Sequence, residues 1–328
     1  MATSITDSPP RVIARELDEL RAHLDEIIPP KRLDDNLLVA TWNIRHFGGL
    51  TDKWQSEQDD SPKRDLHALR CIAEIVSRFD VVAIQEVKDN IKALRHMLKV
   101  LGPHWGLIMT DVTLGKAGNA ERMAYVFDAR RVKASGLAGE LVVPPEWLEG
   151  SGITPGALTR QFVRTPYAVS FLASGFTFIL VTLHVIYGQS AAGRTGELQG
   201  IADWLADWAG REKSWGHNLI ALGDFNIDRK GDANFDAFTS TGLRAPQALD
   251  AVPRTIFASG GSKFYDQIAW FTGEGDAPML SLNYTGRGGT FDFTQAALRT
   301  RGLTTNQLSW RISDHYPLWV EFSTRRDF

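Results

Sequence analysis

Residues 311–320 read Arg311-Ile312-Ser313-Asp314-His315-Tyr316-Pro317-Leu318-Trp319-Val320. A carboxylate and an imidazole stand side by side, and Pro317 then begins an apolar segment that is predicted to be a β-strand. Asp314 and His315 are therefore expected at the end of a sheet. An isolated Asp-His pair more often caps a turn beside a half-exposed histidine. The pair gains significance because four other apolar runs also lead into polar residues.

Three of those runs, 37–42, 81–85 and 176–183, are predicted to be buried strands because apolar and β-branched residues fill them almost completely. They are followed by Asn43, Glu86 and His184, respectively. Taken singly, each of these residues has an ordinary explanation, such as an Asx turn or a structural histidine. Together they place polar groups at the ends of several strands.

The fourth run, 218–222, leads into Gly223-Asp224-Phe225-Asn226. Gly223 is expected to permit a tight turn, and Asp224 and Asn226 should point to the same side of an extended chain. A further predicted strand, 263–271, contains Asp266. Burying an unpaired charge costs several kcal/mol, so Asp266 is expected to have a partner.

Helical periodicity is predicted for 61–79, 90–100, 195–209 and 233–239, the first opening at an N-cap followed by proline, Ser61-Pro62. Strands are predicted at 105–110 and 122–127, and a hairpin joins 167–173 to 176–183. The Gly-rich segments 131–166 and 272–309 are expected to be irregular connections. This alternation, with no repeat or linker, predicts one α/β layered domain.

The N-terminal region, residues 1–36, is expected to be a disordered tail followed by an amphipathic helix over 11–28. Ile13, Leu17, Leu20, Leu24 and Ile27 recur at helical spacing. The helix is expected to pack on the main domain, residues 37–328. A dimer contact is the alternative, although the repeat is too short to specify a stable coiled coil.

Composition narrows the class of protein. The 328 residues are 43% hydrophobic and carry a formal net charge of -3, which argues against bulk electrostatic binding of nucleic acid but leaves room for an enzyme that contacts a few phosphates. Cys71, the one cysteine, lies in an apolar-periodic stretch and reads as a core residue. No run approaches the roughly 18 residues of a membrane span, and no signal sequence is evident. A soluble, cytoplasmic protein is expected.

The polar residues at the predicted strand ends are carboxylates, amides and imidazoles. Oxygen-rich ligation without cysteine suits a hard cation such as Mg²⁺, with Mn²⁺ as a substitute. Such a set fits attack by water on a phosphate.

The ordered motifs resemble those of the endonuclease/exonuclease/phosphatase superfamily, in its deoxyribonuclease I-like branch. They are Trp42-Asn43, Gln85-Glu86, Thr182-Leu183-His184, Gly223-Asp224-Phe225-Asn226, Tyr265-Asp266-Gln267-Ile268 and Ser313-Asp314-His315. The resemblance covers about residues 37–322. It implies a four-layer α/β sandwich, in which helices flank two central mixed β-sheets and the active site lies at one sheet edge.

The resemblance also implies roles for the site residues. Glu86 would hold the metal ion, with Asn43 and Asp314 as further ligands, directly or through water. Asn226 would donate to a phosphate oxygen, and Asp224 would orient or deprotonate the attacking water.

Two histidines complete the implied machinery. His315 would be fixed by Asp266 and act as general base or as an electrophilic clamp on the phosphate. His184 would be the general acid on the leaving oxygen, supported by Glu121. Arg164 would contact the substrate phosphate. Unlike the secreted deoxyribonucleases, this chain has no aromatic residue just before the supporting glutamate and no disulfide.

The function expected from these residues is a divalent-metal-dependent phosphodiesterase, a DNA endonuclease that uses in-line attack of an activated water. A phosphoesterase of the same superfamily acting on a phosphoinositide, sphingomyelin or a nucleotide is the nearest alternative, because the fold serves all of them. A non-catalytic binding module is the more distant one, and the loss of a catalytic residue would mark it.

Overall fold

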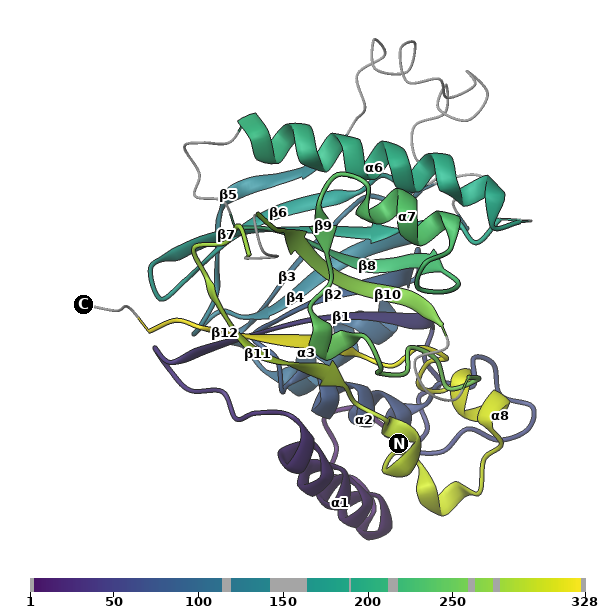
Figure 1. Ribbon diagram of the computed structural model, residues 1–328. Helices are drawn as coiled ribbons and strands as arrows, with labels where there is room; N and C mark the ends of the chain where they lie inside the picture. The colour runs from purple at the N-terminus through teal and green to yellow at the C-terminus, as the bar shows by residue number, and fades with distance from the viewer. Residues whose placement is uncertain are drawn as a thin grey trace.

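The computed structural model describes residues 3–113, 119–141, 164–188, 190–211, 218–258, 263–273 and 278–325. Within these ranges two six-stranded β-sheets pack face to face, and helices cover their outer faces (Figure 1). The predicted fold class, a four-layer α/β sandwich, is confirmed.

Each sheet is mixed, with one parallel pair among antiparallel neighbours. The order in the first is β11 (Asn283–Thr290), β12 (Leu318–Ser323), β1 (Asn36–Phe47), β2 (Val81–Lys88), β4 (Glu121–Asp128) and β3 (Trp105–Met109). The order in the second is β5 (Lys133–Glu140), β6 (Tyr167–Ala173), β7 (Phe176–His184), β8 (Leu219–Ile227), β10 (Phe264–Phe271) and β9 (Leu243–Arg244). The parallel pairs are β1 with β2 and β7 with β8.

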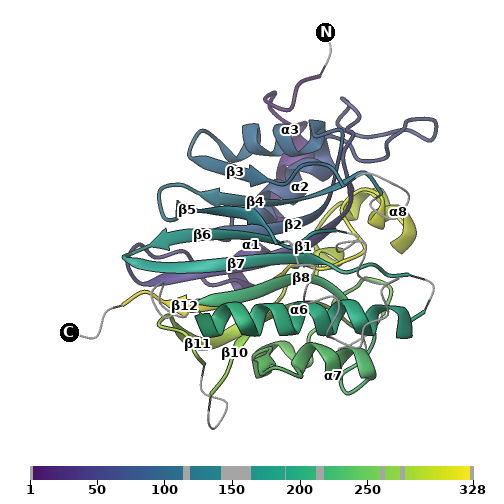
Figure 2. The same ribbon diagram turned by 90° about the horizontal axis from the view of Figure 1, so that it is seen from above.

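Helices form the two outer layers (Figure 2). The first sheet is covered by α1 (Arg11–Ile27), α2 (Leu66–Val76) and α3 (Lys92–Leu101), whose apolar faces share one buried cluster with β1 and β2. The second is covered by α6 (Ala192–Arg211) and α7 (Ala233–Thr239), which pack on β7 and β8. The short helix α8 (Thr305–Ser309) precedes the turn to β12.

Between the sheets lies a third cluster rich in aromatic rings, including Tyr125, Phe171 and Phe322. A buried polar bridge crosses this layer below the site. Gln85 of β2 donates to Thr182 Oγ1 of β7 over 2.8 Å and also bonds with Thr41 of β1. Because all three groups are buried, the bridge fixes the spacing of the sheets below the ends of their parallel strands.

The two parallel pairs bring the polar strand ends together. Asn43 of β1 is in register with Gln85, the residue before Glu86 in β2. In the other sheet, His184 of β7 is in register with Asp224 of β8. Since parallel strands end at the same edge, each sheet carries its polar residues to one side of the molecule.

Glu86, expected at the end of its strand, lies within β2, and Gly223, expected to permit a tight turn, lies within β8. Glu86 has φ +60° where the pairing of β2 with both neighbours shifts register, so a bulge directs its side chain. Gly223 has φ +141°, and a Cβ there would lie 2.1 Å from Leu183 O. Close approach of β7, and not a turn, therefore requires the glycine.

Three further expectations are wrong. The second helix begins at Leu66, because Asp65 caps it by accepting from Ala68 N, and not at Ser61-Pro62. The segment 131–166 contains β5, an edge strand with alternating exposure, while 142–163 lie outside the described residues. The segment 272–309 contributes β11, whose Gly288 packs so close to β12 that a Cβ would be 2.9 Å from Trp319 O.

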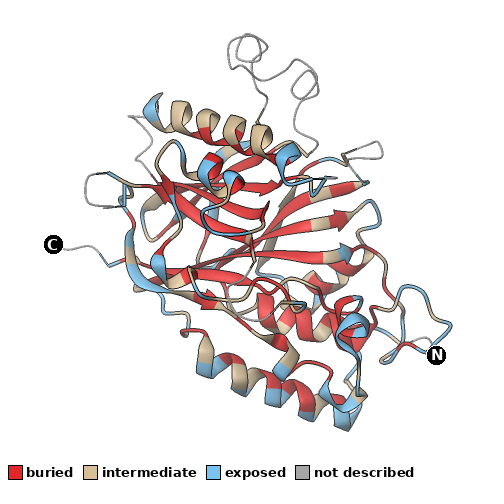
Figure 3. Ribbon diagram, turned by 45° about the vertical axis from the view of Figure 1, so that its right-hand side comes forward, coloured by how far each residue is buried: buried red, intermediate tan, exposed pale blue. Residues whose placement is uncertain are grey.

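The N-terminal helix is confirmed at Arg11–Ile27, and its apolar positions, among them Leu20 and Leu24, are buried in the core of the same chain (Figure 3). Ahead of the helix, residues 3–10 are mostly exposed. Ile5 is buried beside α2, where Arg70 donates to its carbonyl oxygen over 2.6 Å. Burial of one isoleucine and a charged hydrogen bond hold this segment.

In the described part of the chain, no helix combines the length and the apolar character that crossing a membrane requires.

Candidate active site

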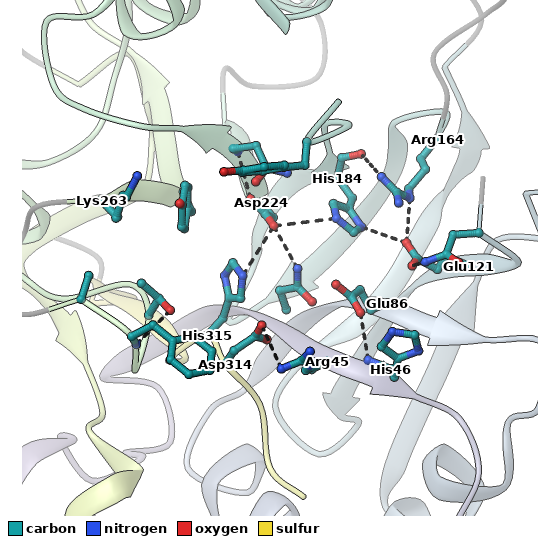
Figure 4. Close-up of a pocket in the computed structure, with 18 residues that line it drawn as sticks. Arg45, His46, Glu86, Glu121, Arg164, His184, Asp224, Lys263, Asp314 and His315 are labelled. Carbon is teal, nitrogen blue, oxygen red and sulfur yellow. Dashed lines mark hydrogen bonds and ion pairs between the residues drawn. The ribbon is translucent and has the colours of Figure 1, made fainter. Parts of the chain in front are cut away.

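A cleft of about 480 Å³ opens where the strand ends of the two sheets meet (Figure 4). All predicted site residues line it except Asp266, which lies behind His315. Those that line it are Asn43, Glu86, Glu121, Arg164, His184, Asp224, Asn226, Asp314 and His315. The sheet topology thus brings together residues that are far apart in the sequence, from Asn43 to His315. A hydrogen bond from Trp42 Nε1 to His315 O joins the same two regions across 273 positions.

Asp224 occupies the centre of the cleft. Its Oδ2 accepts from Asn43 Nδ2 over 2.9 Å, a bond between the two sheets, and its Oδ1 accepts from the backbone N of Asn226 over 2.9 Å. Nε2 of His184 and Nε2 of His315 lie 3.7 Å and 3.9 Å from Oδ2. A carboxylate held this firmly between two imidazoles can orient a small molecule such as water.

His315 is supported from behind. Its Nδ1 lies 2.7 Å from Oδ2 of Asp266, which is fully buried. Burial raises the pKa of Asp266 to about 6, although His315 acts in the opposite direction. Desolvation would lower the pKa of His315, but Asp266, and then Asp224 and Asp314, raise it well above its ordinary value. The contact fixes Nδ1 as the supported nitrogen and turns Nε2 toward the cleft.

His184 also has a buried carboxylate beside its Nδ1, at ion-pair distance and without a hydrogen bond. Its Nδ1 lies 3.3 Å from Glu121 Oε2, and Arg164 Nε lies 2.7 Å from the same oxygen. Lys88 Nζ lies 2.8 Å from Glu121 Oε1. Burial would raise the pKa of Glu121, but His184, Arg164 and Lys88 together hold it well below its usual range. Glu121 is therefore a permanent carboxylate that turns Nε2 of His184 toward Asp224.

The other side-chain oxygens that could bind a metal ion face the same cleft. Glu86 accepts from the backbone N of His46 over 2.9 Å, and Asp314 lies 3.7 Å from Arg45 Nη1. Asn43 Oδ1 is buried and has no hydrogen-bond partner, although the amide nitrogen of the same side chain is bonded. A buried oxygen without a partner is costly, so a cation or an ordered water fits beside it.

The donor set suits a cation that keeps much of its water. Among the described residues, no three His, Cys, Asp or Glu side chains are grouped so as to hold a metal ion by themselves. Glu86, Asp314 and the free oxygen of Asn43 offer two carboxylates and one amide, which is the sparse protein ligation that Mg²⁺ accepts when waters and substrate phosphate complete its shell. The residues therefore fit the group that the sequence predicted.

A buried arginine holds two parts of this wall together. Arg64 donates to the backbone oxygens of Arg45 and His46 at the end of β1 and of Arg311 and Ile312 before Asp314. Ser313 adds a second link by donating to Asn43 O over 2.6 Å. These bonds position the segment that carries Asn43 against the segment that carries Asp314.

The sequence did not single out several residues of the cleft. Arg45 and His46 follow Asn43 in a strand that is longer than expected, and the extra length is what carries them into the cleft. Other lining residues come from segments without a motif: Asn119, Tyr187, Thr255, Phe257, Ala258 and Lys263. Tyr265 also lines the cleft; it stands in a motif, but the motif predicts no role for it. The only sequence signal for Arg45 is its alternation with Asn43, which places both on one face of β1.

Two facing sheets, with two carboxylate-supported imidazoles and a cluster of oxygen donors at their common edge, define a hydrolase of the α/β-sandwich class. A family model described as "Endonuclease/Exonuclease/phosphatase family" matches residues 40–315. The chain belongs to this family, and it is accordingly a hydrolase that acts on phosphoester bonds.

Known proteins resemble this chain in sequence or in fold. A protein named deoxyribonuclease from Thioalkalivibrio sp. (strain K90mix) is 26% identical over 90% of this chain and 73% of its own length. Deoxyribonuclease-1 of Bos taurus is 26% identical over 87% of this chain and 92% of its own length. The structure of a mannosyl-6-phosphatase from Bacteroides thetaiotaomicron superposes with a TM-score of 0.54, at 20% identity, over 87% of this chain and 99% of that one.

Proposed function

We propose that the protein is a Mg²⁺-dependent phosphodiesterase that cleaves DNA as an endonuclease, by in-line attack of water and without a covalent intermediate. The observation that carries the proposal is the pair of imidazoles on opposite sides of Asp224, each backed at Nδ1 by a buried carboxylate. One imidazole suits the attacking side of a phosphate and the other the leaving side.

Asp224 and His315 serve the attacking side. Asp224 accepts the hydrogen bonds of Asn43 and Asn226, so its remaining lone pairs can orient the water. Nε2 of His315, held in place by Asp266, donates to a phosphate oxygen or takes the proton of the water. Asn226 gives one amide hydrogen to Val185 O over 2.7 Å, which leaves the other for a phosphate oxygen.

His184 serves the leaving side. A sugar hydroxyl is a poor leaving group unless its oxygen receives a proton as the bond breaks. Nε2 of His184 is the group placed to give that proton, because Glu121 occupies the neighbourhood of Nδ1. Arg164, which lies against Glu121 and lines the cleft, keeps the carboxylate oriented and adds positive charge near the phosphate.

Glu86, Asp314 and Asn43 Oδ1 would hold the cation. When bound there, Mg²⁺ would neutralise charge that accumulates on the phosphate oxygens.

DNA is favoured as substrate by the relatives named deoxyribonucleases, which match the chain over nearly its whole length. Arg45 and Lys263 also line the cleft and can contact phosphates that flank the cleaved one. A small phosphoester is the competing substrate class, because a relative of the same fold is named a mannosyl-6-phosphatase.

A substrate panel tests the proposal. Plasmid DNA, single-stranded DNA, RNA and small phosphoesters are incubated with the wild-type chain in Mg²⁺ and in EDTA. We expect nicking of circular plasmid in Mg²⁺ alone, and at least about 100-fold slower cleavage by Glu86→Gln and by His315→Ala. Glu57→Gln, the same chemical change at an exposed glutamate, is the control and should cleave normally. Intact plasmid beside rapid turnover of a small phosphoester would refute the assignment to DNA.

A further inference from the structure

Trp310 is an exposed indole in an otherwise buried segment. Its side chain is 40% exposed, whereas Ser309, Arg311 and Ile312 are buried. It follows the last residue of α8, at the point where the chain turns toward Asp314. A large aromatic ring left in water next to a functional cleft commonly contacts a ligand.

Arg45 lies against the face of this indole. Its guanidinium carbon is 3.8 Å from the ring centroid, and its Nη1 donates to Ser309 Oγ over 2.7 Å. The same guanidinium lines the cleft and lies 3.7 Å from Asp314. The His46 ring also packs against the indole, with ring centroids 5.3 Å apart. Trp310, with Arg45 stacked on its face, forms a positively charged aromatic surface, the Trp310 platform, which adjoins the cleft through Arg45 and His46.

The other exposed aromatic side chains lie at the same place. Among the described residues, the aromatic rings that remain largely exposed are those of Tyr187, Phe257 and Trp310. Tyr187 and Phe257 line the cleft, and Trp310 packs on Arg45, which also lines it. The rest of the described surface carries no such ring, so the aromatic exposure is specific to the mouth of the cleft.

We propose that the Trp310 platform stacks an unpaired base next to the scissile phosphate, an inference that rests on the proposed cleavage of DNA. The protein should therefore prefer single-stranded or locally unpaired DNA to duplex. An aromatic face binds the π-face of any base, and a neighbouring guanidinium strengthens the contact and neutralises the adjoining phosphate. In a duplex each base already has its faces covered by neighbours, so the platform has nothing to bind.

The test compares Trp310→Ala with wild type by kcat/KM in Mg²⁺. The substrates are a single-stranded oligonucleotide, the duplex of the same sequence, and a strand of equal length whose sugars carry no bases. Wild type should prefer the single strand to the duplex. Trp310→Ala should lose about 10-fold on the base-bearing single strand, with no change on the base-free strand. Trp310→Phe should recover most of the loss, because the smaller ring still stacks.

Leu172→Ala is the matched control, because Leu172 is an exposed hydrophobic residue on β6 that does not line the cleft; it should act as wild type on all three substrates. A wild-type preference for duplex, or an equal loss by Trp310→Ala on base-bearing and base-free strands, would overturn the platform while leaving DNA cleavage in place. If wild type cleaves none of the three strands but turns over a small phosphoester, the proposed function itself has failed.

Discussion

At the scale of single residues, the proposed function divides the site into groups that would hold a cation and groups that would contact the phosphate. Asp314 and His315 are neighbours in sequence, yet Asp314 faces Arg45 and the cleft, whereas His315 leans on Asp266. The neighbours therefore belong to different parts of the machinery. Activity measurements that vary the metal ion can separate the two roles.

Asp314→Asn and His315→Ala should respond differently to Mn²⁺. The amide of asparagine keeps one oxygen for a cation, so raised Mn²⁺ should restore part of the DNA cleavage that Asp314→Asn loses in Mg²⁺. His315→Ala removes a group that is proposed to act on the water or the phosphate and not to bind the metal, so Mn²⁺ should not restore the cleavage that it loses. The check is the cleavage rate across a titration of each ion; equal rescue of both variants would contradict the division.

Changing the leaving group of the substrate tests the proposed role of His184 as general acid. His184→Ala should slow cleavage of DNA by about 100-fold or more, the usual contribution of a general acid. On a phosphodiester with a 4-nitrophenyl leaving group, which departs without a proton, the loss should be far smaller. His315→Ala serves as the comparison and should slow both substrates. A His184→Ala variant that is equally impaired on both would mean that His184 acts elsewhere than at the leaving oxygen.

At the scale of secondary structure, most elements could be predicted, because hydrophobic period and length decide them. The helix expected at 233–239 is α7, and the hairpin of β6 and β7 lies where its Ser174-Gly175 turn predicted. The two strands that were missed share a cause. The edge strands β5 and β11 are rich in glycine and half exposed, so backbone pairing with a neighbour, and not a hydrophobic pattern, makes them strands.

The backbone conformation of Glu86 lowers the stability of β2 in order to place a site residue. Its left-handed φ within β2 costs a non-glycine residue about 1 kcal/mol. The free energy of unfolding of Glu86→Gly should therefore be about 1 kcal/mol higher than that of Glu86→Ala, although both variants lose activity. At Glu140 in β5, where φ is not positive, the same two substitutions should rank in the opposite order. Urea unfolding of the four variants measures both comparisons.

At the scale of the whole molecule, the sequence indicated which residues would meet but not how they would be held. The resemblance to the superfamily predicted a site at one edge of the sheets, and the parallel pairs β1 with β2 and β7 with β8 bring the polar strand ends to it. The crossing bonds from Asn43 to Asp224 and from Gln85 to Thr182, and the stack of Trp310 on Arg45, depend on how the sheets and the α8 segment meet. No local pattern encodes contacts between residues that are 181 or 97 positions apart.

The N-terminal helix also belongs to this scale. Leu20 of α1 is fully buried in the core of its own chain. Leu20→Ala should lower the free energy of unfolding by about 2–5 kcal/mol, with a midpoint that does not vary with protein concentration. Val12→Ala, at an exposed position of the same helix, should change it by less than about 0.5 kcal/mol. A concentration-dependent midpoint would instead assign α1 to a dimer.

The positive charge of Arg64 affects how strongly a metal ion and a phosphate would bind to the site. Burial lowers its pKa to about 10, against the charges of Glu86, Asp65 and Asp314, so it remains a cation at neutral pH. Its charge already offsets part of the negative field of the proposed metal ligands before any ion arrives. A cation held by Glu86 and Asp314 would therefore bind weakly alone and more tightly once a phosphate brings further negative charge. Metal and substrate would then bind with positive cooperativity, each raising the affinity for the other.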